Sequence, residues 1–262
     1  MEKIAATVGI LTFNSASTLE RTLQSVRMFD EIVISDGGST DTTVDIAKRY
    51  GTRVINQLGT HPIDFAQEKN HLLSHATHAW YLALDSDETA SPELIEGIRQ
   101  ITSSSANQPL IYSIPMGLMF EGKDIPHFSS LPGYQTRFFS KKSGATYVKP
   151  IHERIDFPPQ SVGTLTGKWY IHWNRDRLHF SSFTKYLDRD AALGAKQPLG
   201  KFIRWKIFHN LRGAAYIALY TLRSRLLYRW SECAPLKLEL HKIGYKLMHV
   251  ICALRFRYES PK

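Results

Sequence analysis

Residues 80 to 88 read Trp-Tyr-Leu-Ala-Leu-Asp-Ser-Asp-Glu, an apolar run that stops at three acidic residues within four positions. A short apolar run predicts a buried strand, and side chains two positions apart on a strand face the same side. We therefore expect Asp85 and Asp87 to point the same way from a strand end. The carboxyl ends of parallel strands bind ligands, and carboxylates there suit a divalent cation. A solvated loop is the alternative, but clustered acids would repel one another without a cation, so a metal site is favoured.

The segments around this strand alternate between strand-like and helix-like patterns. The strand-like segments are Ile4 to Leu11, Glu31 to Ser35 and Arg53 to Ile55, and the helix-like ones begin near Ser17, Thr42, Asp64 and Ser91. This alternation predicts an α/β fold with a mainly parallel, doubly wound sheet. Shorter strands are expected at Leu110 to Met116, Gln135 to Ser140 and Ala145 to Val148. The later part of the sheet should therefore be mixed.

Several helix starts carry capping signals. Asp64 and Gln67 have capping-box spacing, and Ser91-Pro92 combines an N-cap residue with a first-turn proline. Ser17 is expected to cap the first helix.

Residues 35 to 41, Ser-Asp-Gly-Gly-Ser-Thr-Asp, follow the second predicted strand. The glycines allow a sharp turn, and Ser39 and Thr40 are expected to cap the next helix. The segment lacks the lysine of a P-loop and the third glycine of a dinucleotide fingerprint. A capped turn explains the glycines and serine but not Asp36 and Asp41 together, so a ligand-binding role is considered for Asp36.

Taken together, these motifs resemble a known family. The Asp36 to Asp41 string, the Leu84-Asp85-Ser86-Asp87-Glu88 string and Leu11-Thr12-Phe13-Asn14 resemble glycosyltransferase family 2 on a GT-A fold. Lys69-Asn70 and Ile151-His152-Glu153 match pairs in its lipopolysaccharide inner-core glucosyltransferase subgroup. The resemblance spans roughly residues 4 to 175.

The resemblance implies a site for a nucleotide-sugar donor, with UDP-hexose as the first candidate. Asp36 would bond the base, with Thr12 and Asn14 lining the same pocket. Asp85 would approach the ribose or the metal, and Asp87 would coordinate Mg²⁺ or Mn²⁺ on the diphosphate. Glu88 would orient its neighbours. The further donor-site residues are Lys69, Asn70 and Arg137, although an ordinary strand role is as open for Arg137.

An inverting sugar transfer also needs a base for the acceptor hydroxyl. Glu153 is the leading candidate on the resemblance, with His152 as a neighbouring group or acceptor ligand. A surface ion pair of Glu153 with Arg154 or Lys149 is the competing interpretation. The Glu-Asp pair that many family members use as the base is missing from the middle third of the chain.

His172 lies among aromatic residues in Trp169-Tyr170-Ile171-His172-Trp173. It could be a further metal ligand or diphosphate contact, while a lone histidine between aromatic residues is more often a hydrogen-bonded core residue.

Charge divides the chain into two parts. Residues 1–176 hold 16 basic and 19 acidic side chains, whereas residues 177–262 hold 17 basic and 5 acidic ones. We therefore expect a catalytic domain over 1–175 and a basic amphipathic helical extension over 176–262. The two cysteines form no metal motif, and a secretory signal pattern is not seen near residue 1, so a cytoplasmic, reducing location is expected.

The basic extension is expected to touch an anionic membrane. Its longest charge-free stretch between 201 and 230, Gly213 to Leu222, has ten residues, against about 20 needed to span a bilayer. Basic, aromatic-rich helices can lie in the membrane interface instead. Simple packing on the catalytic domain is the alternative. Nucleic acid is a disfavoured partner because no recognised module is present.

The predicted function is metal-dependent, inverting transfer of a hexose, with glucose as first candidate, to a lipid-linked glycan such as the lipopolysaccharide inner core. The protein would act peripherally at the inner face of the bacterial inner membrane. Open alternatives are a protein or other cell-envelope polysaccharide acceptor, or a non-catalytic nucleotide-sugar-binding protein. A nucleotidyltransferase is disfavoured because residues 7–17 lack a Gly-rich basic loop.

Overall fold

The computed structural model describes residues 2–59, 63–130, 133–179, 187–195 and 197–259. They form two compact units: Met1–Gly117 with Pro132–Ile171, and Leu118–Leu131 with His172–Lys262. The second unit thus contains a segment from the middle of the chain as well as its last third. The boundary expected at residue 175 between a catalytic domain and an extension stays a prediction.

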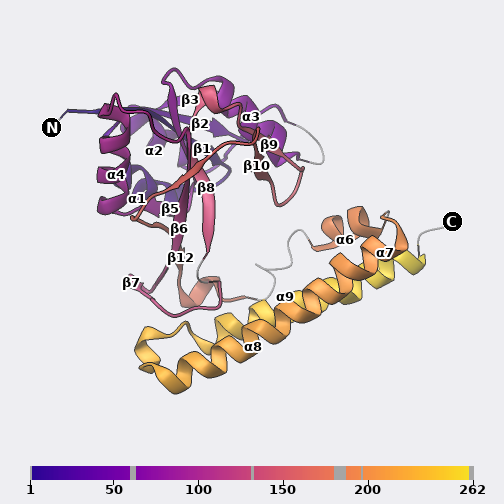
Figure 1. Cartoon of the computed structure of the whole chain (residues 1–262). Helices are drawn as coiled ribbons and strands as arrows, with labels where there is room; N and C mark the ends of the chain where they lie inside the picture. The colour runs from indigo at the N-terminus through magenta and orange to yellow at the C-terminus, as the bar shows by residue number, and fades with distance from the viewer. Residues whose placement is uncertain (1, 60–62, 131–132, 180–186, 196, 260–262) are drawn as a thin grey trace. The chain divides into compact units, whose positions relative to one another are not determined.

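Four parallel strands form one half of the main sheet in the first unit (Figure 1). They are β1 (Ile4–Thr12), β2 (Phe29–Asp36), β3 (Arg53–Asn56) and β4 (Trp80–Asp85), in the order β3-β2-β1-β4. The connecting helices are α1 (Ala16–Ser25), α2 (Thr43–Arg49) and α3 (Phe65–Ser74). The parallel α/β arrangement predicted for this part of the chain is confirmed.

The sheet continues beyond β4 with antiparallel strands, so it is mixed as expected. Strand β8 (Tyr134–Ser140) pairs antiparallel with both β4 and β6 (Ile111–Phe120). The shorter strands are β5 (Glu88–Ala90), β11 (Val162–Thr164) and β12 (Trp169–Trp173). Helix α4 (Pro92–Ser103) follows β5, and a separate hairpin joins β9 (Thr146–Val148) to β10 (Arg154–Asp156).

The two faces of the sheet are covered by different helices. Leu82 and Leu84 of β4 join a core formed with α1, α2 and α4. Tyr81 and Ala83, which alternate with them, pack on the other face against Ala66 of α3. Since side chains alternate along a strand, the next residue of the second set is Asp85. The α3 face is therefore the one from which Asp85 projects.

Two of the expected helix caps are confirmed and two are wrong. The Asp64 carboxylate accepts the backbone N–H of Gln67 at 3.0 Å, and Ser91 accepts that of Leu94 at 3.2 Å. Helix α1 instead has Ser15 at its N-cap, so Ser17 lies inside the helix.

Helix α2 begins at Thr43, beyond Ser39 and Thr40. The Asp41 carboxylate accepts the N–H of Thr43 at 3.0 Å. An acidic side chain satisfies this helix start because it is positioned closer to the first free N–H groups than the residues expected from the sequence.

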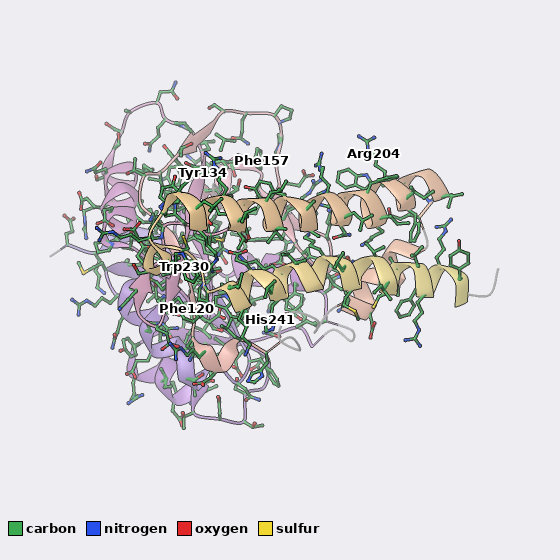
Figure 2. All side chains as sticks on the ribbon, turned by 90° about the horizontal axis from the view of Figure 1, so that it is seen from below. Phe120, Tyr134, Phe157, Arg204, Trp230 and His241 are labelled. Atoms are coloured by element: carbon green, nitrogen blue, oxygen red, sulfur yellow. The ribbon has the colours of Figure 1, made fainter. Side chains whose placement is uncertain are left out.

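The second unit is mainly helical. Its principal helices are α6 (Leu187–Ala195), α7 (Leu199–Phe202), α8 (His209–Leu227) and α9 (Leu236–Glu259), with a π-helical segment, η3 (Ile203–Phe208), between α7 and α8. Helices α8 and α9 run side by side, with Arg204 and Trp230 near the two ends of α8 (Figure 2). Within the described residues, every helix is too short or too polar to cross a membrane.

The segment Leu118–Leu131 is fastened to α9 within this unit. The N–H of Ser129 donates to Glu239 at 3.1 Å, and the Ser129 hydroxyl donates to the same carboxylate. His127 forms an isolated bridge with Cys233. These long-range bonds assign residues 118–131 to the helical unit, which local sequence patterns did not indicate.

Candidate active site

Three strand ends meet at one edge of the sheet in the first unit. In the strand register Thr12 pairs with Asp36, and Leu11 pairs with both Ser35 and Asp85. The first strand therefore lies between the two acidic strand ends, as the parallel topology predicts. Their functional roles remain predictions.

Asp36 is buried and braces the turn that follows its own strand. Its carboxylate accepts hydrogen bonds from Thr12 Oγ1 at 2.9 Å, from Ser39 Oγ at 2.6 Å, and from the N–H groups of Gly38 and Ser39 at 3.0 and 2.8 Å. Gly38 supplies the positive φ of 84° that the turn needs. These four bonds use the acceptor positions of a carboxylate, so a bound base would have to share them.

Asn14 joins the end of β1 to the same turn. Its side-chain oxygen accepts the N–H of Thr40 at 2.8 Å, and its own N–H donates to Ser39 Oγ at 2.8 Å. Its positive φ of 47° is one that asparagine tolerates better than most residues. Asn14 therefore fixes the distance between the two strand ends.

Asp41 is explained by the turn as well. Besides Thr43, it accepts the N–H of Ala16 at 3.1 Å, which ties α1 to α2. The hydrogen bonds from Thr43, and then that from Ala16, lower the pKa of Asp41 below its ordinary value. The view that a capped turn leaves Asp36 and Asp41 unexplained is therefore wrong, because both carboxylates have partners within it.

The acidic string at the end of β4 does not continue as a strand. Strand β4 ends at Asp85, Ser86 and Asp87 form a turn, and Glu88 begins β5. The expectation that alternation along one strand would align Asp85 with Asp87 is therefore wrong. The turn is held by Thr22, whose hydroxyl donates to the Ser86 carbonyl at 3.1 Å.

Glu88 and Arg137 form a buried ion pair beneath this turn. Arg137 Nη1 and Nη2 donate to Glu88 at 2.5 and 3.0 Å, and the guanidinium lies 3.7 Å from the centroid of the Trp169 ring. Glu88 also accepts the N–H of Asp85 at 2.9 Å, so it does hold its neighbour as expected. Burial raises the pKa of Glu88 to about 7, although Arg137 opposes the rise. A phosphate contact of Arg137 stays a prediction and would compete with this pair.

Lys69 links the strand-end acid to the predicted base. Its ammonium lies 3.0 Å from Asp85 Oδ1 and 2.6 Å from Glu153 Oε1. Removal from water opposes the charge of Lys69, but Asp85 and Glu153 outweigh it and raise the pKa of the ammonium. Conversely, Lys69 and then Arg137 overcome the effect of burial and lower the pKa of Asp85. The ion-pair partner of Glu153 is thus the largely buried Lys69, in place of the surface partners considered from the sequence.

Asn70, the next residue on α3, holds the β9–β10 hairpin. Its oxygen accepts the N–H of Tyr147 at 2.8 Å, and its nitrogen donates to the carbonyl of Tyr147 at 2.9 Å. The hairpin carries the segment that ends in Glu153. Asn70 therefore attaches the hairpin to α3, and its contact with a donor stays a prediction.

These groups lie in one cavity of about 570 Å³ within the first unit. It is lined by Lys69, Ala83, Asp85, Tyr134, Gln135, Thr136, Arg137, Tyr147, His152, Glu153, Arg154 and Ile155. Tyr134, Gln135 and Tyr147 are cavity residues that were not predicted from the sequence. The alternation of Gln135 and Arg137 with the core residue Phe138 along β8 was the signal that could have placed Gln135 on the cavity side. No such local signal places Tyr147, which lies on β9.

The side chains present fit a hard divalent cation at the β4 end. Asp85 has a side chain that is 43% exposed, and Asp87 is half-buried in the turn next to it. Carboxylate oxygens of this kind are preferred ligands of Mg²⁺ and Mn²⁺. His172 lies near the end of β12 in the second unit, where its role as a ligand stays a prediction.

Comparison with known proteins gives a family match. Residues 7–150 match the family described as glycosyl transferase family 2. An uncharacterized glycosyltransferase of Rickettsia prowazekii is 31% identical over 186 residues, covering 69% of this chain and 61% of its own. One of Rickettsia felis is 33% identical over 186 residues, with 69% and 63% covered. The chain therefore spans about six tenths of the length of these relatives.

Among solved structures, the mannosyltransferase PcManGT from Pyrobaculum calidifontis, in complex with GDP-Man and Mn²⁺, matches with a TM-score of 0.50 at 13% identity. The match covers 100% of this chain and 89% of that one. At this identity the likeness shows a common fold. Together with the family match it confirms the α/β GT-A fold expected from the sequence.

Proposed function

Because the chain belongs to glycosyl transferase family 2, we propose that it transfers a hexose, with glucose as first candidate, from a nucleotide sugar to a lipid-linked glycan. The lipopolysaccharide inner core is the acceptor we favour. The observation that carries the proposal is the Lys69 ammonium, which brings Asp85 and Glu153 together in a cavity at the strand ends. That cavity offers a donor side and an acceptor side within reach of one another.

The donor occupies the edge formed by β1, β2 and β4 in this proposal. Thr12, Asn14 and the turn at Asp36 surround the nucleoside, and Asn14 sets the separation of the strand ends. Asp87 and Asp85 would hold Mg²⁺ or Mn²⁺. When bound, such a cation neutralises negative charge on the departing diphosphate. The complex of PcManGT with GDP-Man and Mn²⁺ supports the choice of a nucleotide sugar and a divalent metal ion as the bound molecules.

Glu153 acts as the general base. As the acceptor oxygen attacks the anomeric carbon, the bond from that carbon to the diphosphate breaks and the hydroxyl proton passes to Glu153. Attack from the face opposite the leaving group inverts the anomeric centre. Lys69 is a positioning residue here, since its ion pair at 2.6 Å orients the carboxylate before the acceptor arrives.

The acceptor side involves a membrane, with the protein bound peripherally at the inner face of the bacterial inner membrane. Support comes from residues 177–262, which carry 17 basic and 5 acidic side chains. Anionic lipid attracts such segments by about 1 kcal/mol per basic residue near the surface. We keep residues 1–175 as the proposed catalytic domain and 176–262 as the proposed basic extension.

A donor screen tests the proposal. The full chain would be mixed with a panel of UDP- and GDP-sugars with and without Mn²⁺, and both thermal stability and release of nucleoside diphosphate would be measured. We expect one UDP-hexose to stabilise the protein only with Mn²⁺ and to be turned over. Asp87→Ala should lose both effects, whereas Asp45→Ala, an exposed acid on α2, should lose neither. Stabilisation without any turnover on glycan acceptors would instead identify a binding protein.

A further inference from the structure

The helix that leads into α8 contains an irregular turn. The six residues Ile203–Phe208 are π-helical, between the α-helical segments α7 and α8. In an α-helix, each step of four residues drifts by about 40° around the axis. A π-helix has more residues per turn, so residues four positions apart in this segment lie closer to the same side of the helix. Arg204 and Arg212 are therefore nearer to one side than they would be in a continuous α-helix. Such interruptions are rare and are frequently found at functional sites.

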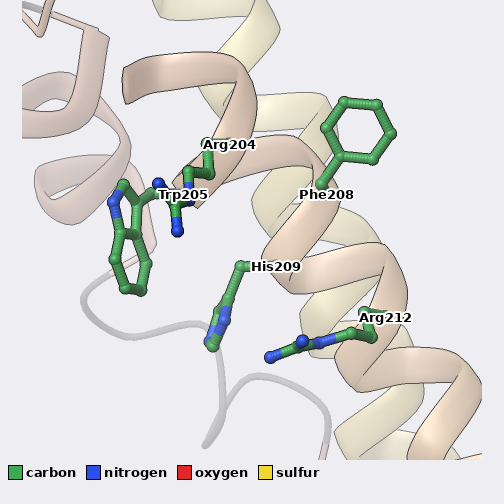
Figure 3. Close-up of a pocket in the computed structure, with 5 residues that line it drawn as sticks. All are labelled: Arg204, Trp205, Phe208, His209 and Arg212. Carbon is green, nitrogen blue, oxygen red and sulfur yellow. The ribbon is translucent and has the colours of Figure 1, made fainter. Parts of the chain in front are cut away.

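The consequence is a small pocket on one side of this helix, with a volume of about 200 Å³. It is lined by Arg204, Trp205, Phe208, His209 and Arg212. The Arg204 guanidinium lies beside the Trp205 indole, and the Arg212 guanidinium points towards the His209 imidazole (Figure 3). The Trp205 and His209 rings stand 5.5 Å apart between centroids. Two planar cations thus converge on a space that has aromatic walls.

Among the residues that the structure describes, nearby acids do not neutralise the positive charge of this pocket. Within the described part of the chain, neither Arg204 nor Arg212 has a carboxylate at ion-pair distance. Asp190, the acid that meets this helix, is engaged by Lys206 at 2.7 Å and by His249 at 2.9 Å. Burial, followed by the charges of Lys246 and Arg212, lowers the pKa of His209. The surroundings of His209 are therefore electropositive, as an anion site requires.

The pocket belongs to a helix whose exposed face is apolar. Phe208 is 65% exposed, and Leu219 and Leu226 are 68% and 76% exposed. The same helix buries the polar residues Asn210, Thr221 and Ser224 against its neighbours. Ala214 and Ile217 are buried as well, so the buried face is mixed. The departure from a helix surrounded by water, where polar residues face the solvent, lies in the apolar exposed face. A surface with exposed leucines and phenylalanine beside unpaired arginines matches the boundary between lipid headgroups and acyl chains.

We propose that the Arg204–Arg212 pocket binds the phosphate group of an anionic phospholipid, while Phe208 and the exposed leucines of α8 enter the acyl boundary. Guanidinium groups recognise phosphate oxygens through paired N–H donors. The inference specifies the membrane contact of the proposed function and rests on it. It replaces a diffuse basic surface by one defined headgroup site.

Vesicle sedimentation of the full chain tests this site. Vesicles of phosphatidylcholine alone would be compared with vesicles that also contain phosphatidylglycerol. The double variant Arg204→Gln/Arg212→Gln would be matched to Arg223→Gln/Arg229→Gln, which removes equal charge from exposed positions outside the pocket. We expect the pocket variant to bind anionic vesicles at least about twenty-five-fold more weakly, from about fivefold for each charge, and the matched variant to lose clearly less. Circular dichroism would check that both variants keep the wild-type helix content.

Equal losses in the two variants would overturn the pocket and leave a diffuse electrostatic contact. A wild-type chain that ignores anionic vesicles would overturn both the site and the proposed membrane contact. Inorganic phosphate is the other possible ligand of the pocket and is tested as a competitor. Displacement of the protein from vesicles at low millimolar phosphate would assign the pocket to free phosphate and overturn the lipid assignment. Sugar transfer to a soluble acceptor glycan is measured separately. This distinguishes a failure of the proposed catalytic function from a failure of the proposed lipid site at Arg204 and Arg212.

Discussion

The cavity of the first unit and the outer face of α8 use charge in opposite ways. In the cavity, Lys69 is largely buried between Asp85 and Glu153, and Arg137 is buried against Glu88. On η3 and α8, Arg204 and Arg212 are exposed beside apolar side chains, and neither has an acidic partner among the residues that the structure describes. Paired, buried charges are held in fixed positions suited to catalysis, whereas unpaired, exposed ones remain available to an external anion. The difference separates a site for chemistry from a surface for attachment.

The largest expected effect is the loss of transfer on Asp87→Ala. Metal-assisted stabilisation of a leaving group is worth several kcal/mol, so we expect kcat to fall by about a thousandfold or more. The variant should unfold at the wild-type temperature without ligand. Near-full turnover with Mn²⁺ would contradict the proposed role of Asp87 in holding the metal ion.

Glu153→Gln should lower kcat by about 10²- to 10⁴-fold, because it removes the group that accepts the hydroxyl proton. Donor affinity should change little, since Glu153 lies on the acceptor side in the proposal. Steady-state kinetics with varied donor would separate the two effects. A variant with wild-type kcat across the pH range would remove Glu153 from this role and leave the Lys69 pair as a structural feature.

The buried Glu88–Arg137 ion pair should affect the free energy of unfolding. Arg137→Met leaves the Glu88 carboxylate buried without its partner, which typically costs about 3–5 kcal/mol. Urea unfolding would measure the loss, and Arg223→Met on the exposed face of α8 is the matched control. We expect the control to change stability by less than about 0.5 kcal/mol. Similar losses in both variants would contradict the contrast between buried and exposed arginines.

A smaller effect concerns acid stability. Glu31 accepts bonds from Thr7, Thr77 and Arg53. Although burial opposes it, these bonds lower the pKa of Glu31 to about 2. A lowered folded-state pKa stabilises the protein above the unfolded value near 4.5, and this contribution is lost as pH falls towards 2. Glu31→Gln should flatten the fall in stability over that range, by about 2 kcal/mol. Unchanged acid unfolding would show that the bonds contribute little.

The sequence predicted the parallel strands and the arrival of the Asp36 and Asp85 strand ends at one edge of the sheet, with β1 between them, because both depend on local patterns and on one rule of sheet topology. It misplaced Asp87, since a turn interrupts the acidic string at Ser86. It also missed the Lys69–Glu153 pair. That contact requires the β9–β10 hairpin to lie against α3, which is set by the bonds of Asn70 to Tyr147 across 77 positions. Long-range hydrogen bonds of this kind leave no periodic signal in the sequence.

The path of the chain through residues 118–131 has a consequence for how the protein can be shortened. This excursion leaves the first unit after Gly117 and bonds to α9 through Ser129 and Glu239, and the chain lies again in the first unit at Gly133. Ile125 and Phe128 are buried in it. A chain cut after residue 175 would retain the excursion but lack the helix that satisfies it. The two units therefore cannot be separated by a single cut, and a minimal soluble fragment would need residues 118–131 replaced by a short polar turn.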